Sequence, residues 1–589
     1  MKLYILIIFV PLFCAVSLPF TLAHLPLGLL ALYLSLDFKE ELWRSLLKIF
    51  YKEISSLNLN TLHKLLTKHK NALVYLGEGY EFTQKHALLL DKRLLKYQKK
   101  RKTTLTANFG SEILDDLELF CHHKLFTTPR ILTSHMLIMG TTGAGKTRLF
   151  DLLISQAIMR GDTVIIFDPK NDADLIKKAE LCCNFAQRPQ DFLRLDPENP
   201  EKSICFNPLA CFNNASEIGE RITSLMEGSG SAASFKSYAN LAITSAVVAL
   251  INLKRPVTLR NIKEALATPD IYFKALFKAL DTITFNLNLP EITRFWENLH
   301  KLFKEEKKNS KSAKISELLG LKNFYNYLIS HQYLKIRPDL ETLFATAALD
   351  KDYFAKVSNG AAPILSSLTS ESRAFVLSAE PPQQVLDFAQ IIKAHKVLHI
   401  ALPSLKDLQT SQNLGRILLT DLTSQASRIY NHKINADNVP KSPVSIFIDE
   451  CGEVASPALV QLLNKARGAN FAITLAIQSF RDLVKNGGSD QALQILDNCN
   501  TKLSLRVGSL ETASIFCECL EKTTLASRSQ ILATSFSEQA LTDSQSLIKS
   551  YKKDSLISPQ ILMGLKNLEY FALIGSSTLY KGKIPLVKD

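Results

Sequence analysis

The chain has 589 residues, 46% of them hydrophobic and 21% charged, so about two or three domains are expected rather than one core. This composition excludes a chain that is disordered throughout, because most of the sequence can bury apolar surface. A formal net charge of +14 favours an acidic partner, either nucleic acid or an anionic membrane, although abundant lysine alone carries little weight.

The first segment, from Leu3 to Leu36, has no charged residue apart from the titratable His24. As one helix it would extend about 51 Å at about 1.5 Å per residue, which exceeds a hydrocarbon core of about 30 Å. Two full spans need about 40 residues. We predict a transmembrane anchor over residues 1–36, as a tight two-span hairpin or one tilted span, rather than a cleavable signal peptide. Lys39 and Arg44 follow it and place the rest of the chain in the cytoplasm.

Residues 37–130 are predicted to form a membrane-proximal segment. Within them the run DKRLLKYQKKRK (91–102) is strongly basic. It could face anionic lipid or DNA, and a solvated helix face explains it equally well.

A phosphate-binding loop follows the apolar run MLIM (136–139), with the spacing G-x-x-x-x-G-K-[ST]. An amphipathic helix is predicted over Lys146–Arg160, and its free N–H groups would face the anion. Lys146 can reach the β- and γ-phosphates of ATP, and the Thr147 hydroxyl can ligate Mg²⁺. The expected nucleotide-binding residues of the loop are Gly140, Thr141, Thr142, Gly143, Ala144, Gly145, Lys146 and Thr147.

Strands and helices alternate on both sides of a long helical stretch. Val164–Phe167 is predicted as a buried strand that delivers Asp168 to its carboxyl end, where α/β sheets place ligands. Residues 240–360 lack strand signals and suit helices such as Leu259–Ala267 and Ile315–Leu328. Further strands are predicted at Val397–Leu402, Val444–Asp449, Phe471–Ile477, Lys502–Val507 and Tyr570–Ile574. We therefore predict an α/β fold with a parallel, doubly wound sheet over 131–239 and 361–589, interrupted by an all-helical domain at 240–360.

The second half of an ATP site is predicted in VSIFIDECGEV (444–454). Asp449 can hold Mg²⁺ beside Thr147, and Glu450 can orient or deprotonate the attacking water. An Asp-Glu pair that closes a strand is common by itself, but here it follows a phosphate-binding loop. The 10 Cys show no zinc-ligand spacing, so Mg²⁺ is the only metal expected.

Two further residues are candidates for supporting roles. Gln478 ends the strand after the Asp-Glu strand, where its amide could sense the γ-phosphate or the water. Arg467 precedes that strand and could stabilise transition-state charge in a neighbouring subunit, as arginine fingers do. A polar strand end and a surface arginine are the simpler alternatives.

Together the strings GTTGAGKT, FDPKNDADL, IFIDE and RGANFAITLAIQS resemble the coupling proteins of bacterial conjugation and type IV secretion. The strings YLGEGYEFTQKH (75–86) and YKGKIPL (580–586) are similar to the TraD-type proteins of integrating conjugative elements. The resemblance covers most of residues 71–589.

This resemblance implies a RecA-like motor domain with an inserted helical domain, anchored in the bacterial inner membrane with the motor in the cytoplasm. It implies a homo-oligomeric ring, expected to be a hexamer, that uses ATP and Mg²⁺. The implied cargo is single-stranded DNA with a covalently bound relaxase, transferred into the channel proteins of a type IV secretion system. In the family's motif positions Lys146, Thr147, Asp449 and Glu450 would form the hydrolytic set, with Gln478 and Arg467 in support.

Other functions remain open at this stage. A coupling receptor that delivers protein effectors would share the same motifs. A membrane adaptor that binds ATP only for assembly would not need Lys146, Asp449 and Glu450 together. A chromosome-partition pump would be expected to carry a C-terminal DNA-reading module.

Overall fold

The structure is a computed structural model. It describes residues 56–69, 73–98, 123–226, 232–305, 311–349, 360–380, 382–402, 406–431, 442–537 and 540–588, with single positions at 114, 117, 354, 358 and 404. The predicted anchor at residues 1–36 lies outside this part of the chain. No helix within it combines the length and apolarity needed to cross a bilayer.

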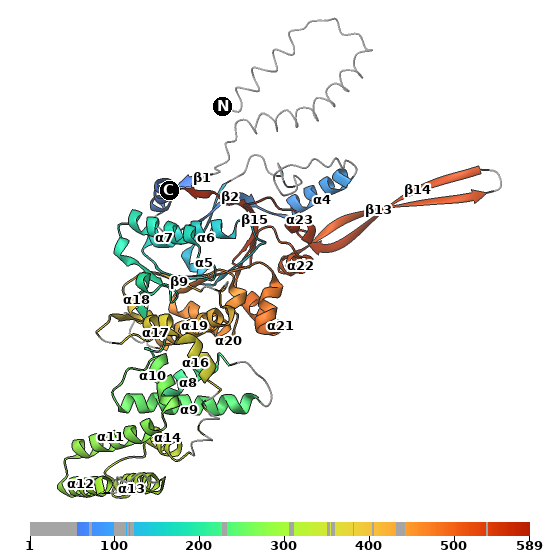
Figure 1. The fold of residues 1–589 in the computed structure, drawn as a ribbon. Helices are drawn as coiled ribbons and strands as arrows, with labels where there is room; N and C mark the ends of the chain where they lie inside the picture. Colours follow the sequence, from blue (N-terminus) through green and yellow to red (C-terminus); the bar gives the residue numbers. More distant parts are fainter. Residues whose placement is uncertain are drawn as a thin grey trace.

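One sheet of 11 strands forms the centre of the fold, in the order β3-β2-β16-β15-β12-β4-β11-β10-β5-β9-β6 (Figure 1). In that order the strands span His123–Thr127, Val74–Glu81, Thr578–Lys583, Glu569–Ile574, Thr501–Ser504, Met136–Met139, Phe471–Ile477, Val444–Ile448, Thr163–Asp168, Val397–Ala401 and Phe192–Leu195. From β12 to β6 every neighbouring pair is parallel. The predicted α/β fold is confirmed.

The sheet as a whole is mixed, however, so the predicted parallel arrangement holds from β12 to β6 and not for the other strands. β15 pairs antiparallel with both β12 and β16, and β2 continues antiparallel from β16 to β3. The cause is local. The chain turns back directly after Ile574 through Gly575 and Ser576, which both have positive φ, and strands joined by a tight turn must run antiparallel.

β2 and β3 come from the range that the sequence assigned to a membrane-proximal segment. They extend the same sheet, and the Tyr75 backbone N–H donates to Gln156 Oε1 at 2.8 Å, on the helix after the phosphate-binding loop. At the other end of the chain β17 (Leu586–Lys588) runs parallel to β1 (Ser56–Asn58). Leu57 of β1 and Val587 of β17 are buried in the same apolar core as α6, so both ends of the described chain pack beside the central sheet.

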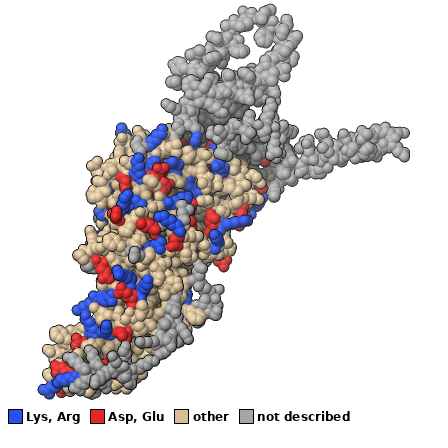
Figure 2. Space-filling model, viewed as in Figure 1, with Lys and Arg blue, Asp and Glu red and all other residues tan. Residues whose placement is uncertain are grey.

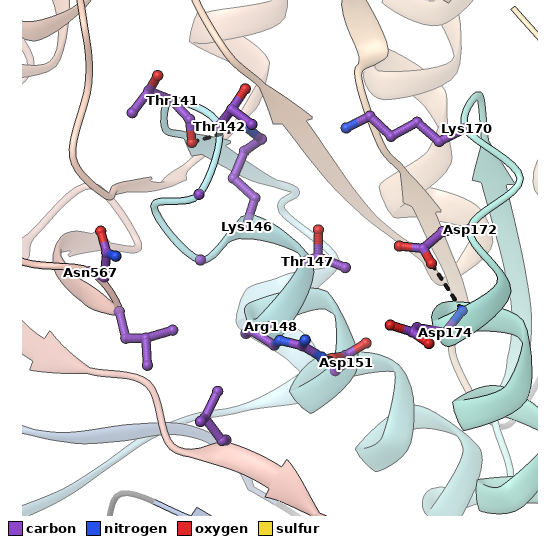
Figure 3. Close-up of a pocket in the computed structure, with 14 residues that line it drawn as sticks. Thr141, Thr142, Lys146, Thr147, Arg148, Asp151, Lys170, Asp172, Asp174 and Asn567 are labelled. Atoms are coloured by element: carbon purple, nitrogen blue, oxygen red, sulfur yellow. Dashed lines mark hydrogen bonds and ion pairs between the residues drawn. The ribbon is translucent and has the colours of Figure 1, made fainter. Parts of the chain in front are cut away.

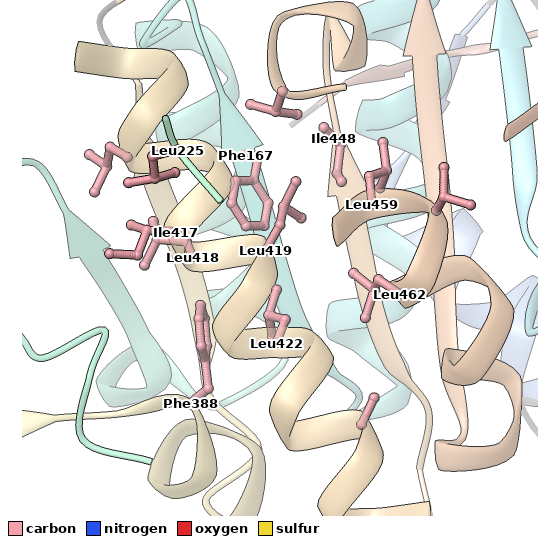
Figure 4. Packing of buried hydrophobic residues seen from close by; sticks show 14 of the residues in the cluster. Phe167, Leu225, Phe388, Ile417, Leu418, Leu419, Leu422, Ile448, Leu459 and Leu462 are labelled. Carbon is pink, nitrogen blue, oxygen red and sulfur yellow. The ribbon is translucent and has the colours of Figure 1, made fainter. Parts of the chain in front are cut away.

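Helices cover both faces of the parallel strands. On one face α6 (Lys146–Arg160) and α7 (Ala173–Phe185) pack on alternate strand residues such as Val164 and Ile166. On the other face lie α19 (Leu408–Asn431), α20 (Pro457–Ala466) and α21 (Phe480–Asn498). Figure 4 shows the second core, where Phe167 lies against Leu419 and Leu422 of α19. Burial on both faces explains why these strands are continuous apolar runs.

A helical region is inserted between β7 (Cys205–Phe206) and β8 (Val385–Leu386), and it extends away from the sheet in Figure 1. Its helices are α8 (Ala215–Thr223), α9 (Ala232–Asn252), α10 (Leu259–Ala267), α11 (Asp270–Leu287), α12 (Pro290–Glu305), α13 (Lys311–Ser330), α14 (Pro338–Ala347), α16 (Ala362–Leu368) and α17 (Glu371–Leu377). The remaining helices are α3 (Leu59–Lys68), α4 (Gln84–Gln98), α5 (Pro129–Leu132), α18 (Phe388–Lys393), α22 (Leu510–Glu518) and α23 (Pro559–Met563). The predicted all-helical region is therefore present; its boundaries as a domain stay a prediction.

A long hairpin is the one large element that the sequence did not predict. β13 (Lys522–Ser537) and β14 (Ala540–Ser555) pair with each other along their whole length and project from the body in Figure 1. Their sequences are rich in Ser, Thr and Gln and lack a continuous apolar run. A two-stranded ribbon outside the main sheet need not be buried on both faces, so its strands need no continuous apolar run. The pattern that predicted the other strands is therefore absent here.

A buried ion pair joins the helical region to the sheet-covering helices. Arg221 on α8 donates from Nη1 to Asp421 Oδ1 on α19 at 3.1 Å, and both side chains are fully buried. Its Nη2 donates to Ser424 Oγ and to the Cys211 carbonyl, each at 3.0 Å. Burial raises the pKa of Asp421 to about 7, although the guanidinium opposes this. The pair therefore depends on both partners being present.

We predict that Arg221→Met lowers the free energy of unfolding by about 3–5 kcal/mol, because it leaves the Asp421 carboxylate buried without its cation. The double variant Arg221→Met/Asp421→Leu should recover most of that loss, since well-packed apolar replacements remove both desolvation costs. Urea unfolding of the purified chain followed by circular dichroism measures both. A double variant as unstable as the single one would contradict this account.

Candidate ATP-binding site

The phosphate-binding loop connects β4 to α6 at the carboxyl edge of the parallel strands. Its entry is fixed by backbone hydrogen bonds from Gly140 N to the Ile477 carbonyl at 3.1 Å and from Thr141 N to the Arg506 carbonyl at 2.8 Å. Gly145 has φ 118°, and a Cβ there would lie 2.9 Å from Leu568. α6 begins without a side-chain cap, so its first N–H groups are available to an anion.

Lys146 is folded over this loop. Its Nζ donates to the Gly140 carbonyl at 2.6 Å, and the residue is 7% exposed. Burial lowers the pKa of Lys146, while the carboxylate of Asp449 acts in the opposite direction. The ammonium is thus held by a neutral carbonyl at the mouth of the loop, where an incoming phosphate would be a stronger partner.

A cleft of about 420 Å³ opens beside the loop (Figure 3). Thr142, Lys146 and Thr147 lie on one side of it, and Lys170 extends toward them from the loop after β5. The C-terminal segment forms a further wall through Asn567, Leu568 and Leu586. The sequence analysis did not find these three residues, because no local pattern shows that a distant segment returns to the loop.

Asp449 and Glu450 stand at the end of β10, next to the loop. Asp449 is 9% exposed, and its Oδ1 accepts a hydrogen bond from Glu450 N at 2.9 Å. Burial raises the pKa of Asp449, and the nearby Lys170 ammonium opposes this shift. Glu450 itself has φ 44° and ψ 49°, a left-handed conformation that is uncommon outside glycine. The turn directs its side chain toward the end of β11.

Gln478 connects the predicted residues. It accepts from Thr142 Oγ1 at 3.3 Å and donates from Nε2 to Glu450 Oε1 at 2.7 Å. The ends of β4, β10 and β11 are thereby linked by side chains. The structure thus brings Thr142, Glu450 and Gln478 into direct contact and places Lys146 and Asp449 beside them; their roles in hydrolysis stay predictions.

The Lys170 contact was missed. Its Nζ lies 2.6 Å from Glu450 Oε1, the same oxygen that Gln478 contacts. Two sequence signals marked this residue without assigning it a firm role: Lys170 follows a strand that ends in Asp168, and both residues match the DPK string of the coupling proteins.

The Asp168 side chain is buried and serves the loop after β5. Its Oδ1 accepts from Lys170 N at 2.9 Å and its Oδ2 from Asp172 N at 2.7 Å. His399 Nε2 lies 3.1 Å from the same Oδ2. Asp168 was expected at a ligand position; its carboxylate instead fixes the backbone that presents Lys170.

Arg467 is at the opposite edge of the sheet. It lies in a 3-10 turn (Arg467–Ala469) before β11, and its side chain is exposed. Seven residues of β11, about 23 Å at about 3.3 Å per residue, separate it from Gln478. Arg467 cannot contact the cleft of its own chain, so its role in a neighbouring subunit stays a prediction.

The donor set fits Mg²⁺. The Thr147 hydroxyl lines the cleft, and Asp449 supplies a carboxylate close enough to act on the neighbouring Lys146. No group of three or more His, Cys, Asp or Glu side chains gathers in metal-binding geometry among the described residues. Nucleotide-bound Mg²⁺ needs only one or two protein ligands, because water and phosphate oxygens complete its shell.

Comparisons with known proteins agree with this geometry. Residues 125–347 match the family described as the central domain of the helicase HerA. Residues 443–567 match the family described as the TraM recognition site of TraD and TraG. The type 4 coupling protein DotL of Legionella pneumophila is 22% identical over 412 residues, which cover 64% of this chain. The chain spans about half of DotL, 47% of its length.

The fold is similar to that of the plasmid coupling protein TrwB in complex with the ATP analogue ADPNP. That comparison gives a TM-score of 0.50 at 14% sequence identity and covers 87% of this chain and 95% of TrwB. TrwB in complex with ADP and Mg²⁺ gives a TM-score of 0.45 at 13% identity, over 78% of this chain and 87% of that one.

A parallel sheet that carries a phosphate-binding loop, with an Asp-Glu pair on a nearby strand, defines the class of P-loop ATPases. Within that class the chain is similar to the TraG/TraD family of type IV coupling proteins over residues 443–567, and its P-loop region is similar to HerA.

The stability of this sheet should depend on pH through His135, which lies before β4 near Arg467. Its Nε2 contacts the Leu463 carbonyl at 2.9 Å, and burial lowers its pKa from 6.5 to about 4. Between pH 6.5 and 4 the His135 imidazole is protonated in the unfolded chain and neutral in the folded chain. The contribution of the neutral imidazole to the free energy of unfolding is therefore fully present above pH 6.5 and is lost as pH falls toward 4. We predict a loss of up to about 3 kcal/mol across that window.

His135→Asn is the matched variant, because asparagine tolerates the positive φ of 62° at this position. It should unfold with a flatter pH dependence than the wild type between pH 6.5 and 4. An unchanged slope would mean that other groups cause the dependence.

Proposed function

We propose that this chain is a membrane-anchored ATPase that couples relaxase-bound single-stranded DNA to a type IV secretion channel and drives its transfer during conjugation. The observation that carries the proposal is the connected set of Lys146, Asp449, Glu450 and Gln478 at one edge of the sheet. A protein that used ATP only for assembly would not require a carboxylate held next to the phosphate-binding loop.

The side chains suggest how ATP would be hydrolysed. Backbone N–H groups of the loop would hold the phosphates, and Lys146 would exchange the Gly140 carbonyl for a phosphate oxygen. Glu450 would accept a proton as a water oxygen attacks the terminal phosphorus and the bond to the ADP oxygen breaks. Gln478 would hold Glu450 in place. Mg²⁺, held by Thr147 and Asp449, would neutralise phosphate charge.

Hydrolysis would be completed between subunits. Arg467 is exposed and remote from its own cleft, as an arginine supplied to a neighbour must be. We propose a homo-oligomeric ring, a hexamer by analogy with ring motors, held at the bacterial inner membrane by residues 1–36 with the motor in the cytoplasm.

DNA would be held through its backbone. On the face that Figure 2 shows, basic and acidic side chains are intermixed over the motor and the helical region. A protein with a net charge of +14 would bind phosphates without sequence preference.

Protein effectors are the alternative cargo. The match to DotL supports membership of the coupling proteins and does not identify what is carried. Stimulation of ATP hydrolysis by single-stranded DNA would favour the DNA motor, and stimulation by a purified relaxase without DNA would favour the protein receptor.

We predict that Lys146→Ala and Glu450→Gln each reduce ATP hydrolysis by more than about 100-fold, because they remove a phosphate contact and the general base. Glu450→Gln should still bind ATP. Both should abolish conjugative transfer while the protein reaches the membrane. Glu180→Gln, an exposed residue on α7, is the matched control. A normal transfer frequency in either active-site variant would refute the motor.

We also predict that the full-length chain binds single-stranded DNA without regard to base sequence. Binding should weaken with salt, and log K should fall against log salt by about 0.7 for each phosphate neutralised. Fluorescence anisotropy with oligonucleotides of different sequence measures both. A strong preference for one duplex site at physiological salt would be incompatible with this function.

A further inference from the structure

Glu450 has two side-chain partners at the end of β10. Its Oε1 receives two donors, Lys170 Nζ at 2.6 Å and Gln478 Nε2 at 2.7 Å. A carboxylate that serves as a general base must have a lone pair free for the proton of water.

The backbone of Lys170 is fixed while its side chain can move. Asp168, which is 1% exposed, anchors the loop through the N–H groups of Lys170 and Asp172. The Lys170 side chain is 43% exposed and crosses the cleft toward the phosphate-binding loop in Figure 3. A long, half-exposed lysine on a fixed loop can reach more than one partner from one anchor point.

The charges around Lys170 match a triphosphate. Burial tends to lower the pKa of Lys170, but the hydrogen bond to Glu450 and the nearby Asp449 outweigh it and raise the pKa. Lys146 lines the same cleft, so the two ammonium groups face one small space. Two cations that face one cleft would be drawn together by an anion between them.

We propose that Lys170 is a positioning residue that holds Glu450 inactive until the terminal phosphate of a bound nucleoside triphosphate takes its ammonium. Exchange of the carboxylate for the phosphate would free one lone pair of Glu450 Oε1, while the remaining hydrogen bond from Gln478 keeps the side chain in place. The inference rests on the proposed ATPase function. It makes Lys170 a sensor that separates ATP from ADP, because ADP lacks the phosphate that competes for it.

The test uses Lys170→Met in the full-length chain purified in detergent micelles, with Lys177→Met as the control because Lys177 is an exposed lysine on the following helix. Two quantities are measured in the absence of DNA. One is kcat and KM for ATP hydrolysis. The other is the affinity for a non-hydrolysable ATP analogue and for ADP, each with Mg²⁺, by isothermal titration calorimetry.

Loss of the Lys170 contact should raise kcat by up to about fivefold, the equilibrium effect of one partly exposed ion pair. It should also raise KM and reduce the preference for the ATP analogue over ADP by about tenfold, since one charge-assisted hydrogen bond to the phosphate is lost. Lys177→Met should change neither quantity.

A lower kcat in Lys170→Met would overturn the inference, because it would make Lys170 a stabiliser of the transition state. An unchanged preference for the analogue over ADP would also overturn it. If the wild type binds ATP but never hydrolyses it, the proposed function fails instead, and the binding preference still tests the Lys170 exchange.

Discussion

The parallel alignment of β4, β10 and β11 is the constraint on which the rest of the structure depends. Parallel strands end at the same edge, so three segments far apart in the sequence deliver their next residues to one place. The loop after β4, the Asp-Glu pair after β10 and Gln478 after β11 are neighbours for this reason alone. Both faces of these strands are buried under helices, which fixes the spacing of the three ends.

Much of this edge could be predicted from sequence because its signals are local. The helix Lys146–Arg160 was predicted with both of its ends, and so was the strand Phe471–Ile477. Glycines in the phosphate-binding loop, the glycine at position 161 that ends the helix, and continuous apolar runs each indicate the structure of the residues next to them. Asp449 and Glu450 could be assigned because a buried strand leads directly to them.

What could not be predicted depends on contacts between distant segments. The pairing of Lys170 with Glu450, the return of Leu568 and Leu586 to the cleft, and the antiparallel direction of β15 all follow from topology. Asp168 shows a different limit. Its place at a strand end was recognised, but its use to hold a loop could not be distinguished from ligand binding without the loop's geometry. The β13–β14 hairpin was missed because it does not join the main sheet and therefore carries no buried run.

The C-terminal wall of the cleft has a consequence for biosynthesis. Leu568 N donates to the Ala144 carbonyl at 2.9 Å and Leu586 lines the cleft, so the phosphate-binding loop is completed by residues that the ribosome adds more than four hundred positions later. β2 likewise has no hydrogen-bonded partner on one of its two edges until β16 has been synthesised. A nascent chain whose helical region is already made would therefore hold an unfinished nucleotide pocket until residues 568–586 have been added. The growing chain would therefore bind ATP with full affinity, and hydrolyse it, only after those residues have been added.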